Sequence, residues 1–252
     1  MTTVMLLLGL MAAVPAALRF LRVAQREHYL PGSTARFAVR WWTVSPINLM
    51  MALVAIGGIA FSPMWWWAAL LPIAAATVGP LGLSLRGSSS PLAWTSRLRR
   101  LSGVTAGLVA IGLVAAYLLD AAAPAGGMVA FGFPLLLDLG LAIAAPVEKK
   151  IGDRWVDKAK DKLATISPRV VAITGSYGKT TTKEYLRLLL EGETQVVASP
   201  ASFNNAMGLA RTVNEHLAVG TDVFVAEMGT YGPGEIAELC SWIPPEISVI
   251  TA

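Results

Sequence analysis

A glycine-rich stretch in the second half of the chain has the residue types that hold phosphate. It reads T-G-S-Y-G-K-T-T-T from Thr174 to Thr182. Glycines in such a turn let the backbone come close to phosphate oxygens, free N–H groups donate to those oxygens, and a lysine adds positive charge. We therefore predict a nucleotide-binding loop formed by Gly175, Ser176, Tyr177, Gly178, Lys179, Thr180 and Thr181.

Two further oxygen-bearing residues are candidates for a metal site beside this loop. Thr180 directly follows the lysine, and Glu227 directly follows the apolar run 223–226. A carboxylate at a strand end is often only solvated, but next to a phosphate loop it is well placed to bind the Mg²⁺ that bridges ATP phosphates. The sequence thus predicts ATP and Mg²⁺ as cofactors, with Lys179 and Glu227 as the catalytic residues.

The elements around the loop are those that a phosphate site needs. The β-branched run 170–173 predicts a buried strand before the loop, and Leu186, Leu189 and Leu190 give the segment after it one apolar helical face. Strand and helix patterns then alternate, with strands expected at 194–198, 223–226 and 247–250 and helices at 206–217 and 236–240. This alternation predicts an α/β domain, residues 169–252, whose parallel sheet holds ligands at the carboxyl ends of its strands.

The loop is shorter than the usual G-x-x-x-x-G-K-[ST], because the position five before Gly178 is Ile173, inside the strand. Its form, T-G-x-x-G-K-T-T-T, resembles the phosphate loop of the Mur ligases, and Lys183-Glu184 is similar to the D-Ala-D-Ala-adding branch of that family. The segments S-P-A-S-F-N-N-A-M-G (199–208), A-E-M-G (226–229) and G-E-I (234–236) also resemble family motifs. The resemblance covers 168–252, about a third of the chain.

The resemblance implies an ATP-dependent enzyme that joins an amino acid or dipeptide to a carboxylate in bacterial peptidoglycan synthesis. It implies that ATP phosphorylates the carboxylate and that an amine then attacks the acyl phosphate. It also implies that Lys179 binds the β and γ phosphates, that Thr180 and Glu227 bind Mg²⁺, and that Asn204 and Asn205 lie near the substrate. Serine and asparagine clusters also form ordinary turns and helix caps, so both interpretations of the two asparagines stay open.

The first part of the chain has the composition of a membrane domain. The whole chain is 55% hydrophobic and only 14% charged, which is too apolar for one ordinary soluble domain. We expect about five transmembrane helices within 1–147, at residues 4–17, 46–61, 64–83, 102–119 and 127–147. A signal peptide is the alternative for the first segment, but no basic residue precedes it.

The arginines predict the orientation of this domain. Loops 19–40 and 86–100 are rich in arginine, whereas the connections at 62–63 and 120–126 have no Lys or Arg. Because positive loops stay in the cytoplasm, we expect a bacterial cell-membrane protein with an external N-terminus and a cytoplasmic ATP-binding domain. The net charge of +4 then indicates membrane lipids as partners, and it does not indicate nucleic-acid binding.

Two features leave alternatives open. Residues 148–168 predict an amphipathic linker helix, which either lies on the membrane or the next domain or is simply solvated. Asp138, in the middle of the last apolar segment, is either a packing residue or a functional one. The single Cys240 excludes an intramolecular disulfide and is expected in the core.

The chain departs from the Mur pattern at both ends. A membrane domain occupies the place of the family's UDP-gripping domain, so the acceptor is expected at the membrane surface, in lipid-linked form, unless the helices only localise the enzyme. The chain also ends before the family would present its adenine site and amine-binding domain, so we expect it to be incomplete and not to ligate by itself. The alternatives are a poly-γ-glutamate synthase-like ligase and a non-catalytic, nucleotide-binding membrane scaffold.

Overall fold

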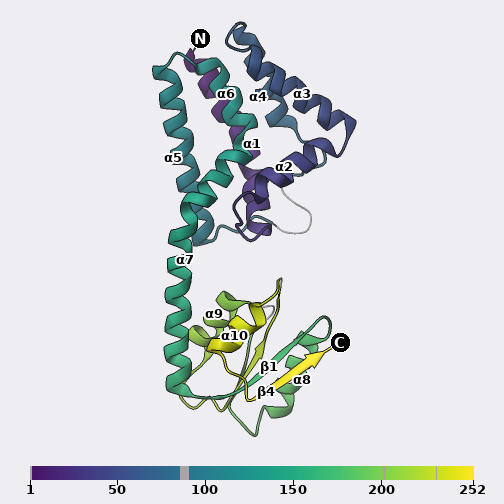
Figure 1. The fold of residues 1–252 in the computed structure, drawn as a ribbon, viewed down its shortest axis with the longest axis vertical. Helices are drawn as coiled ribbons and strands as arrows, with labels where there is room; N and C mark the ends of the chain where they lie inside the picture. The colour runs from purple at the N-terminus through teal and green to yellow at the C-terminus, as the bar shows by residue number, and fades with distance from the viewer. Residues whose placement is uncertain (1, 86–90, 201–202, 231) are drawn as a thin grey trace. The chain divides into compact units, whose positions relative to one another are not determined.

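The computed structural model describes residues 2–85, 91–200, 203–230 and 232–252. The chain divides into two compact units, Met1–Glu148 and Lys149–Ala252 (Figure 1). The first is all-helical, and the second contains all the strands of the described residues.

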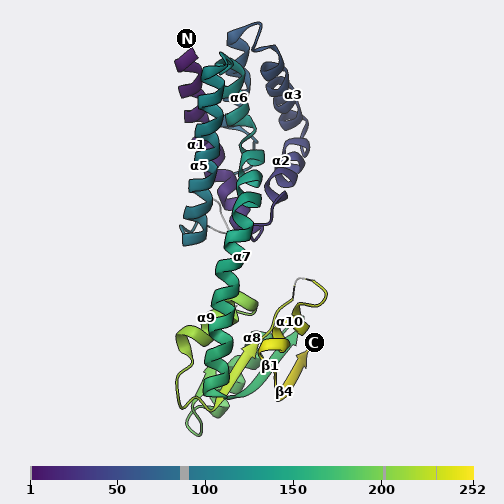
Figure 2. The same ribbon diagram turned by 60° about the vertical axis from the view of Figure 1, so that its left-hand side comes forward.

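Helices of the first unit pack closely through small residues. A Cβ atom added to Gly9 of α1 would lie 2.4 Å from the Cα atom of Gly126 in α6, so only glycine permits this approach of the two backbones. Figure 2 shows α1, α5 and α6 side by side. The elements of this unit are α1 (Thr2–Arg26), α2 (Ser33–Thr43), α3 (Pro46–Phe61), the 3₁₀ helix η1 (Trp66–Ala69), α4 (Leu70–Val78), α5 (Ser96–Leu118), α6 (Ala122–Phe131) and the first part of α7 (Phe133–Ile166).

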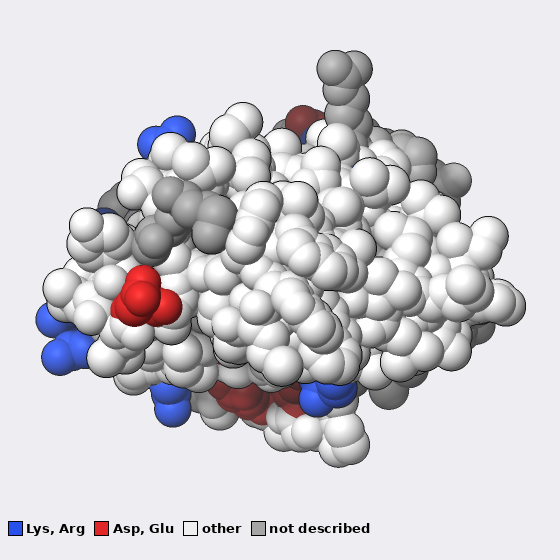
Figure 3. Space-filling model, turned by 90° about the horizontal axis from the view of Figure 1, so that it is seen from above, with Lys and Arg blue, Asp and Glu red and all other residues white. Residues whose placement is uncertain are grey.

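The apolar helices differ in detail from the five predicted spans. Among the described residues, α1 and α5 are each long and apolar enough to cross a membrane, and the bent pairs α2 with α3 and α6 with α7 raise the number to four if each pair is one span. The segment predicted at 64–83 forms a helical stretch, Trp66–Val78, that is short of the roughly 20 residues a spanning helix needs. Seen from above, the face in view is mostly uncharged, with one acidic group on it and Lys and Arg toward its edge (Figure 3).

The predicted arginine-rich loop 19–40 is wrong in its extent, because α1 continues to Arg26 and α2 begins at Ser33. Arg19 is buried inside this unit. Its guanidinium donates to the carbonyl oxygens of Ala76, Thr77 and Val78 at 3.0–3.2 Å. These are orphan carbonyls of the last turn of α4, so Arg19 acts as a helix C-cap. Of the second predicted loop, residues 86–90 lie outside the described residues.

Asp138 has the packing role. Its carboxylate accepts hydrogen bonds from the backbone N–H groups of Thr34 at 3.2 Å and Ala35 at 2.8 Å. Gly32, the N-cap residue of α2, has no side chain to satisfy these donors. Asp138 therefore caps the N-terminus of α2 from a different helix, which explains a carboxylate in an apolar segment.

The second unit is a parallel α/β sheet, as the alternation predicts. The strands have the order β2-β3-β1-β4, and all pairs are parallel. Its elements are the last part of α7, then β1 (Arg169–Gly175), α8 (Lys179–Leu190), β2 (Val196–Ala198), α9 (Ala206–His216), β3 (Val223–Glu227), α10 (Glu235–Trp242) and β4 (Ile247–Thr251).

Alternate residues of β1 and β3 face different helices. Val170, Ala172, Phe224 and Ala226 pack in one cluster with residues of α7, α9 and α10. Val171, Ile173, Val223 and Val225 pack on the other face against Leu186 and Leu190 of α8. Helices thus cover both faces of the central strands, which leaves their carboxyl ends to carry the site.

The charged segment predicted as a separate linker is part of the 34-residue helix α7, which contains Pro146. Ala159 and Leu163, on one face of this helix, are buried in the core of the second unit. The segment is therefore not a solvated linker, because its apolar side forms part of the α/β domain.

Candidate nucleotide and metal site

The glycine-rich loop connects β1 to α8, and its two glycines are needed for different reasons. Gly175 has φ of 139° and Gly178 has φ of 79°, values that L-residues rarely adopt. At Gly175 an added Cβ would lie 2.4 Å from the carbonyl oxygen of Thr251 in β4, whereas at Gly178 the nearest such contact is 3.9 Å away. Gly175 is thus fixed by close packing as well as by backbone conformation, and Gly178 by conformation alone.

The loop lies open to solvent at the start of α8. Ser176, Tyr177, Gly178, Thr180 and Thr181 are all exposed. The Tyr177 N–H donates to the Ala252 carbonyl oxygen at 2.6 Å. The other predicted phosphate-binding groups are accessible to a ligand from the solvent side.

Lys179 is the first residue of α8, and its ammonium group lies back over the loop. Its Nζ donates to the carbonyl oxygens of Gly175 at 2.6 Å and Ser176 at 3.2 Å. This places the cation above the turn in which phosphate oxygens would be held. Phosphate oxygens there would compete with the two carbonyls for the ammonium hydrogens.

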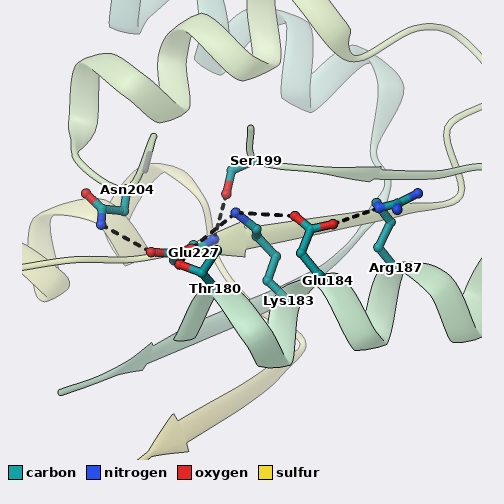
Figure 4. A network of polar contacts seen from close by, with 7 residues as sticks. All are labelled: Thr180, Lys183, Glu184, Arg187, Ser199, Asn204 and Glu227. Atoms are coloured by element: carbon teal, nitrogen blue, oxygen red, sulfur yellow. Dashed lines mark hydrogen bonds and ion pairs between the residues drawn. The ribbon is translucent and has the colours of Figure 1, made fainter. Parts of the chain in front are cut away.

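Glu227 is the centre of the polar cluster beside the loop (Figure 4). The residue is 2% exposed, at the carboxyl end of β3. Its Oε2 accepts from Thr180 Oγ1 at 2.9 Å and from Lys183 Nζ at 3.2 Å, and its Oε1 accepts from Asn204 Nδ2 at 3.2 Å. Its backbone N–H donates to Ser199 Oγ at 3.1 Å. The structure therefore brings Thr180 and Glu227 together, as predicted, although 47 positions separate them in the sequence.

Lys183 is the residue that sequence reasoning missed. Its side chain is completely buried, and it forms an ion pair with Glu227. The signal was available, since Lys183, Leu186 and Leu190 share the helical spacing i, i+3, i+7, which is the face that α8 turns to the sheet. A lysine on a buried face needs a carboxylate partner, and Glu227 supplies it.

The two asparagines have different positions. The Asn204 side chain belongs to the Glu227 cluster, and the backbone carbonyl oxygen of Asn204 accepts from the Gly229 N–H at 2.8 Å. Asn205 is the N-cap of α9, with Oδ1 accepting from the Gly208 N–H at 2.9 Å. The ordinary helix-cap interpretation thus describes Asn205, and only Asn204 points to the cluster. Ala201 and Ser202 of the same motif lie outside the described residues.

The oxygen atoms present fit a magnesium ion. Thr180 Oγ1 and Glu227 Oε2 are 2.9 Å apart. Neighbouring ligands in an octahedron with Mg–O distances of about 2.0–2.1 Å are themselves about 2.9 Å apart. Within the described ranges, no three His, Cys, Asp or Glu side chains come together as a metal site. The remaining ligands would therefore be phosphate oxygens and water, which is how Mg²⁺ usually binds with nucleotides.

A chain of charges continues along the surface of α8. Glu184 lies 3.8 Å from Lys183 Nζ and pairs with Arg187, which also pairs with Glu191. The hydrogen bond with Glu184, followed by the charge of Glu191, raises the pKa of Arg187. These partly exposed pairs orient Glu184 and add little stability.

A surface hollow of about 470 Å³ lies beside the asparagine motif in the second unit. Arg211 lines it, with its guanidinium over the Phe203 ring at 5.4 Å and paired with Glu215 at 2.9 Å. Because Glu215 also lines the hollow, the positive charge of Arg211 is balanced there. Cys240 is half-buried beside Met228 in the core of the unit, as expected of a packing residue.

Residues 173–252 match the Mur ligase middle domain family. The chain is 43% identical to "UDP-N-acetylmuramoyl-tripeptide--D-alanyl-D-alanine ligase" of Mycobacterium leprae over 81 residues. This matched segment makes up 32% of this chain and 16% of that protein. The protein of the same name from Bacillus subtilis is 39% identical over 93 residues, 37% of this chain and 20% of the relative. The chain thus spans about a fifth or less of the length of these relatives.

A solved structure is also similar in sequence. MurF ligase from Thermotoga maritima, in complex with ADP, is 38% identical, and the match covers 39% of this chain and 23% of that chain with a TM-score of 0.37.

Proposed function

We propose, on the premise that residues 173–252 carry a Mur ligase middle domain, that the protein is an ATP-dependent ligase that forms an amide bond between a carboxylate and an amine. The observation that carries this proposal is the cluster at Glu227. It joins a glycine-rich loop, a lysine over that loop, and two oxygens at the separation of magnesium ligands. These are the parts that phosphoryl transfer from ATP requires.

The relatives supply the proposed substrate class. They are named for a UDP-N-acetylmuramoyl-tripeptide and D-alanyl-D-alanine. We accordingly propose a muramoyl-peptide carboxylate as the acceptor and the D-Ala-D-Ala amine as the donor, in bacterial peptidoglycan synthesis. The identity of 39–43% over the matched segment supports this choice.

In this reaction, an oxygen of the acceptor carboxylate bonds to the γ-phosphorus while the bond from that phosphorus to ADP breaks. The amine nitrogen then bonds to the carbonyl carbon of the acyl phosphate, phosphate leaves, and the amine loses a proton. Lys179 and the loop N–H groups hold the phosphates in line, and Thr180 with Glu227 would hold Mg²⁺, which supplies positive charge to the phosphate oxygens. Asn204 keeps the Glu227 carboxylate oriented from its other oxygen.

We further propose that the first unit anchors the enzyme in the membrane with its ATP-binding domain in the cytoplasm. Support comes from the two helices long and apolar enough to span, and from Arg97, Arg99 and Arg100 at the start of α5. An anchored enzyme meets a membrane-bound acceptor at a higher effective concentration, so a lipid-linked acceptor belongs to this proposal.

The test is amide formation by the full-length protein in detergent or vesicles. ATP, Mg²⁺, D-Ala-D-Ala and either a soluble or a lipid-linked muramoyl-peptide acceptor are supplied, and the product is identified by mass spectrometry. We expect product only when both acceptor and dipeptide are present, and faster turnover on the lipid-linked acceptor. ATP binding without any turnover that depends on acceptor and dipeptide would instead favour a nucleotide-binding scaffold, and equal rates on both acceptors would contradict the lipid-linked form.

A further inference from the structure

We propose that Lys183 is the counter-charge of the metal-binding carboxylate and makes divalent-metal binding at Glu227 conditional on nucleotide phosphates. This inference rests on the metal role that the proposed function gives to Glu227. In the absence of nucleotide, Lys183 neutralises and orients the carboxylate. A divalent cation then binds with adequate affinity only when it arrives together with phosphate charge.

Burial shows why the carboxylate needs Lys183. Glu227 is 2% exposed and Lys183 is fully buried, so water stabilises neither charge. Lys183 Nζ and Glu227 Oε2 are 3.2 Å apart and form a salt bridge. A buried carboxylate without a nearby positive charge is strongly unfavourable, so Glu227 needs either Lys183 or a bound metal ion as its counter-charge in this position.

Lys179 does not take over this task. Its ammonium group is engaged by the carbonyl oxygens of Gly175 and Ser176, on the loop side of α8. Lys183 lies one helical turn further along, on the side that faces the sheet. Lys179 is thus placed to bind the phosphates, whereas Lys183 pairs with the Glu227 carboxylate.

The hydrogen bonds at Glu227 show which donor can give way to a metal. Oε2 accepts from both Thr180 and Lys183, while Oε1 accepts from Asn204. The Thr180 hydroxyl can rotate about its C–O bond and present a lone pair to a metal, whereas Lys183 is enclosed and keeps its place. Lys183 therefore fixes the direction of Oε2 before and after the metal binds.

The balance of charge at the site explains why metal binding at Glu227 would depend on nucleotide phosphates. The pair of Glu227 and Lys183 has no net charge, and the neighbouring Glu184 is itself paired with Arg187, so a bare divalent cation gains little attraction and is repelled by the nearby ammonium group. Phosphate oxygens above the loop add the negative charge that is missing. Metal and nucleotide binding are thereby coupled through one lysine.

The experiment is a Mn²⁺ titration of the full chain in detergent without nucleotide, followed by electron paramagnetic resonance. The wild type is compared with Lys183→Met, which removes the charge, and with Lys183→Gln, which removes the charge but keeps a hydrogen-bond donor. Arg187→Met, one turn later on α8 and partly exposed, is the matched control. Lys183→Met with Glu227→Gln removes both charges.

We expect both single Lys183 variants to bind Mn²⁺ alone about tenfold or more tightly than the wild type, the usual size of a coupling between two ligands. Mn²⁺ should also raise the thermal midpoint of these variants and not of Arg187→Met or the double variant. Equal Mn²⁺ affinity in wild type and both Lys183 variants would overturn the inference. That outcome is separate from failure of the proposed function, which is judged from amide formation by the wild type.

Discussion

At the scale of single residues, Glu227 determines how the site is arranged. The sequence could predict that Glu227 meets Thr180, because Glu227 follows one predicted strand and Thr180 lies in the glycine-rich loop that follows another. The hydrogen bond between Thr180 and Glu227 shows this contact, and Ile173 of β1 lies opposite Glu227 of β3. It could not predict Lys183 from residue type alone, because lysines on helices are mostly solvated. Only the position of Lys183 on the buried face of α8 distinguishes it.

The ion pair at Glu227 gives a prediction for stability. Glu227→Ala leaves Lys183 buried without a partner and should lower the free energy of unfolding of the second unit by about 3–5 kcal/mol. Replacing both residues, by Glu227→Ala with Lys183→Met, should cost clearly less than the two single losses combined. Hydrogen exchange of the β1 and β3 amides measures both effects. Additive losses would show that the two charges do not act as a pair.

The two loop glycines should respond differently to alanine. Gly178→Ala meets no close contact, so it should cost only the roughly 1–2 kcal/mol of a left-handed conformation. Gly175→Ala should cost more, because its Cβ would overlap the Thr251 backbone and separate β1 from β4. Denaturant unfolding of the two variants compares them directly. Equal losses would argue against the close packing of Gly175.

At the scale of elements, strand and helix periodicity predicted the α/β unit well. The β-branched runs of β1, β3 and β4 and the apolar stripes of α8, α9 and α10 lie where the pattern placed them. The first unit was less predictable. Hydropathy marks apolar residues but does not say where a helix stops, so it missed that α1 continues to Arg26 and that Arg19 is buried as a cap of α4.

The sequence predicts a membrane span and a separate linker helix where the structure has the single helix α7, because the composition changes sharply near Glu148. Its buried residues show that the charged part belongs to the α/β core. Leu163→Ala should therefore destabilise the second unit by about 2–5 kcal/mol, the usual loss for a buried leucine. Lys160→Ala, at an exposed position of the same helix, should change stability by less than about 0.5 kcal/mol. Hydrogen exchange of the strand amides checks both variants, and similar protection in both would contradict the packing of α7.

At the scale of the whole molecule, the orientation in the membrane is a prediction from the arginines. Single cysteines are placed at Leu92 and Ala123 in a Cys240→Ser background, so that no native thiol reacts. A membrane-impermeant thiol reagent should label the Ala123 position in intact cells and should reach the Leu92 position only after lysis. The opposite labelling would place the nucleotide site outside the cell, away from ATP, and would refute the proposed orientation.

The central claim is that the glycine-rich loop and the Glu227 cluster together bind a nucleotide with its metal. Calorimetry of ATP binding to the full-length protein, with and without Mg²⁺, tests it most directly. We predict that Lys179→Ala abolishes binding under both conditions, because the phosphates lose their cation. Glu227→Gln should keep metal-free binding and lose most of the gain that Mg²⁺ gives. Wild-type ATP affinity in both folded variants, with an unchanged effect of Mg²⁺, would contradict the account.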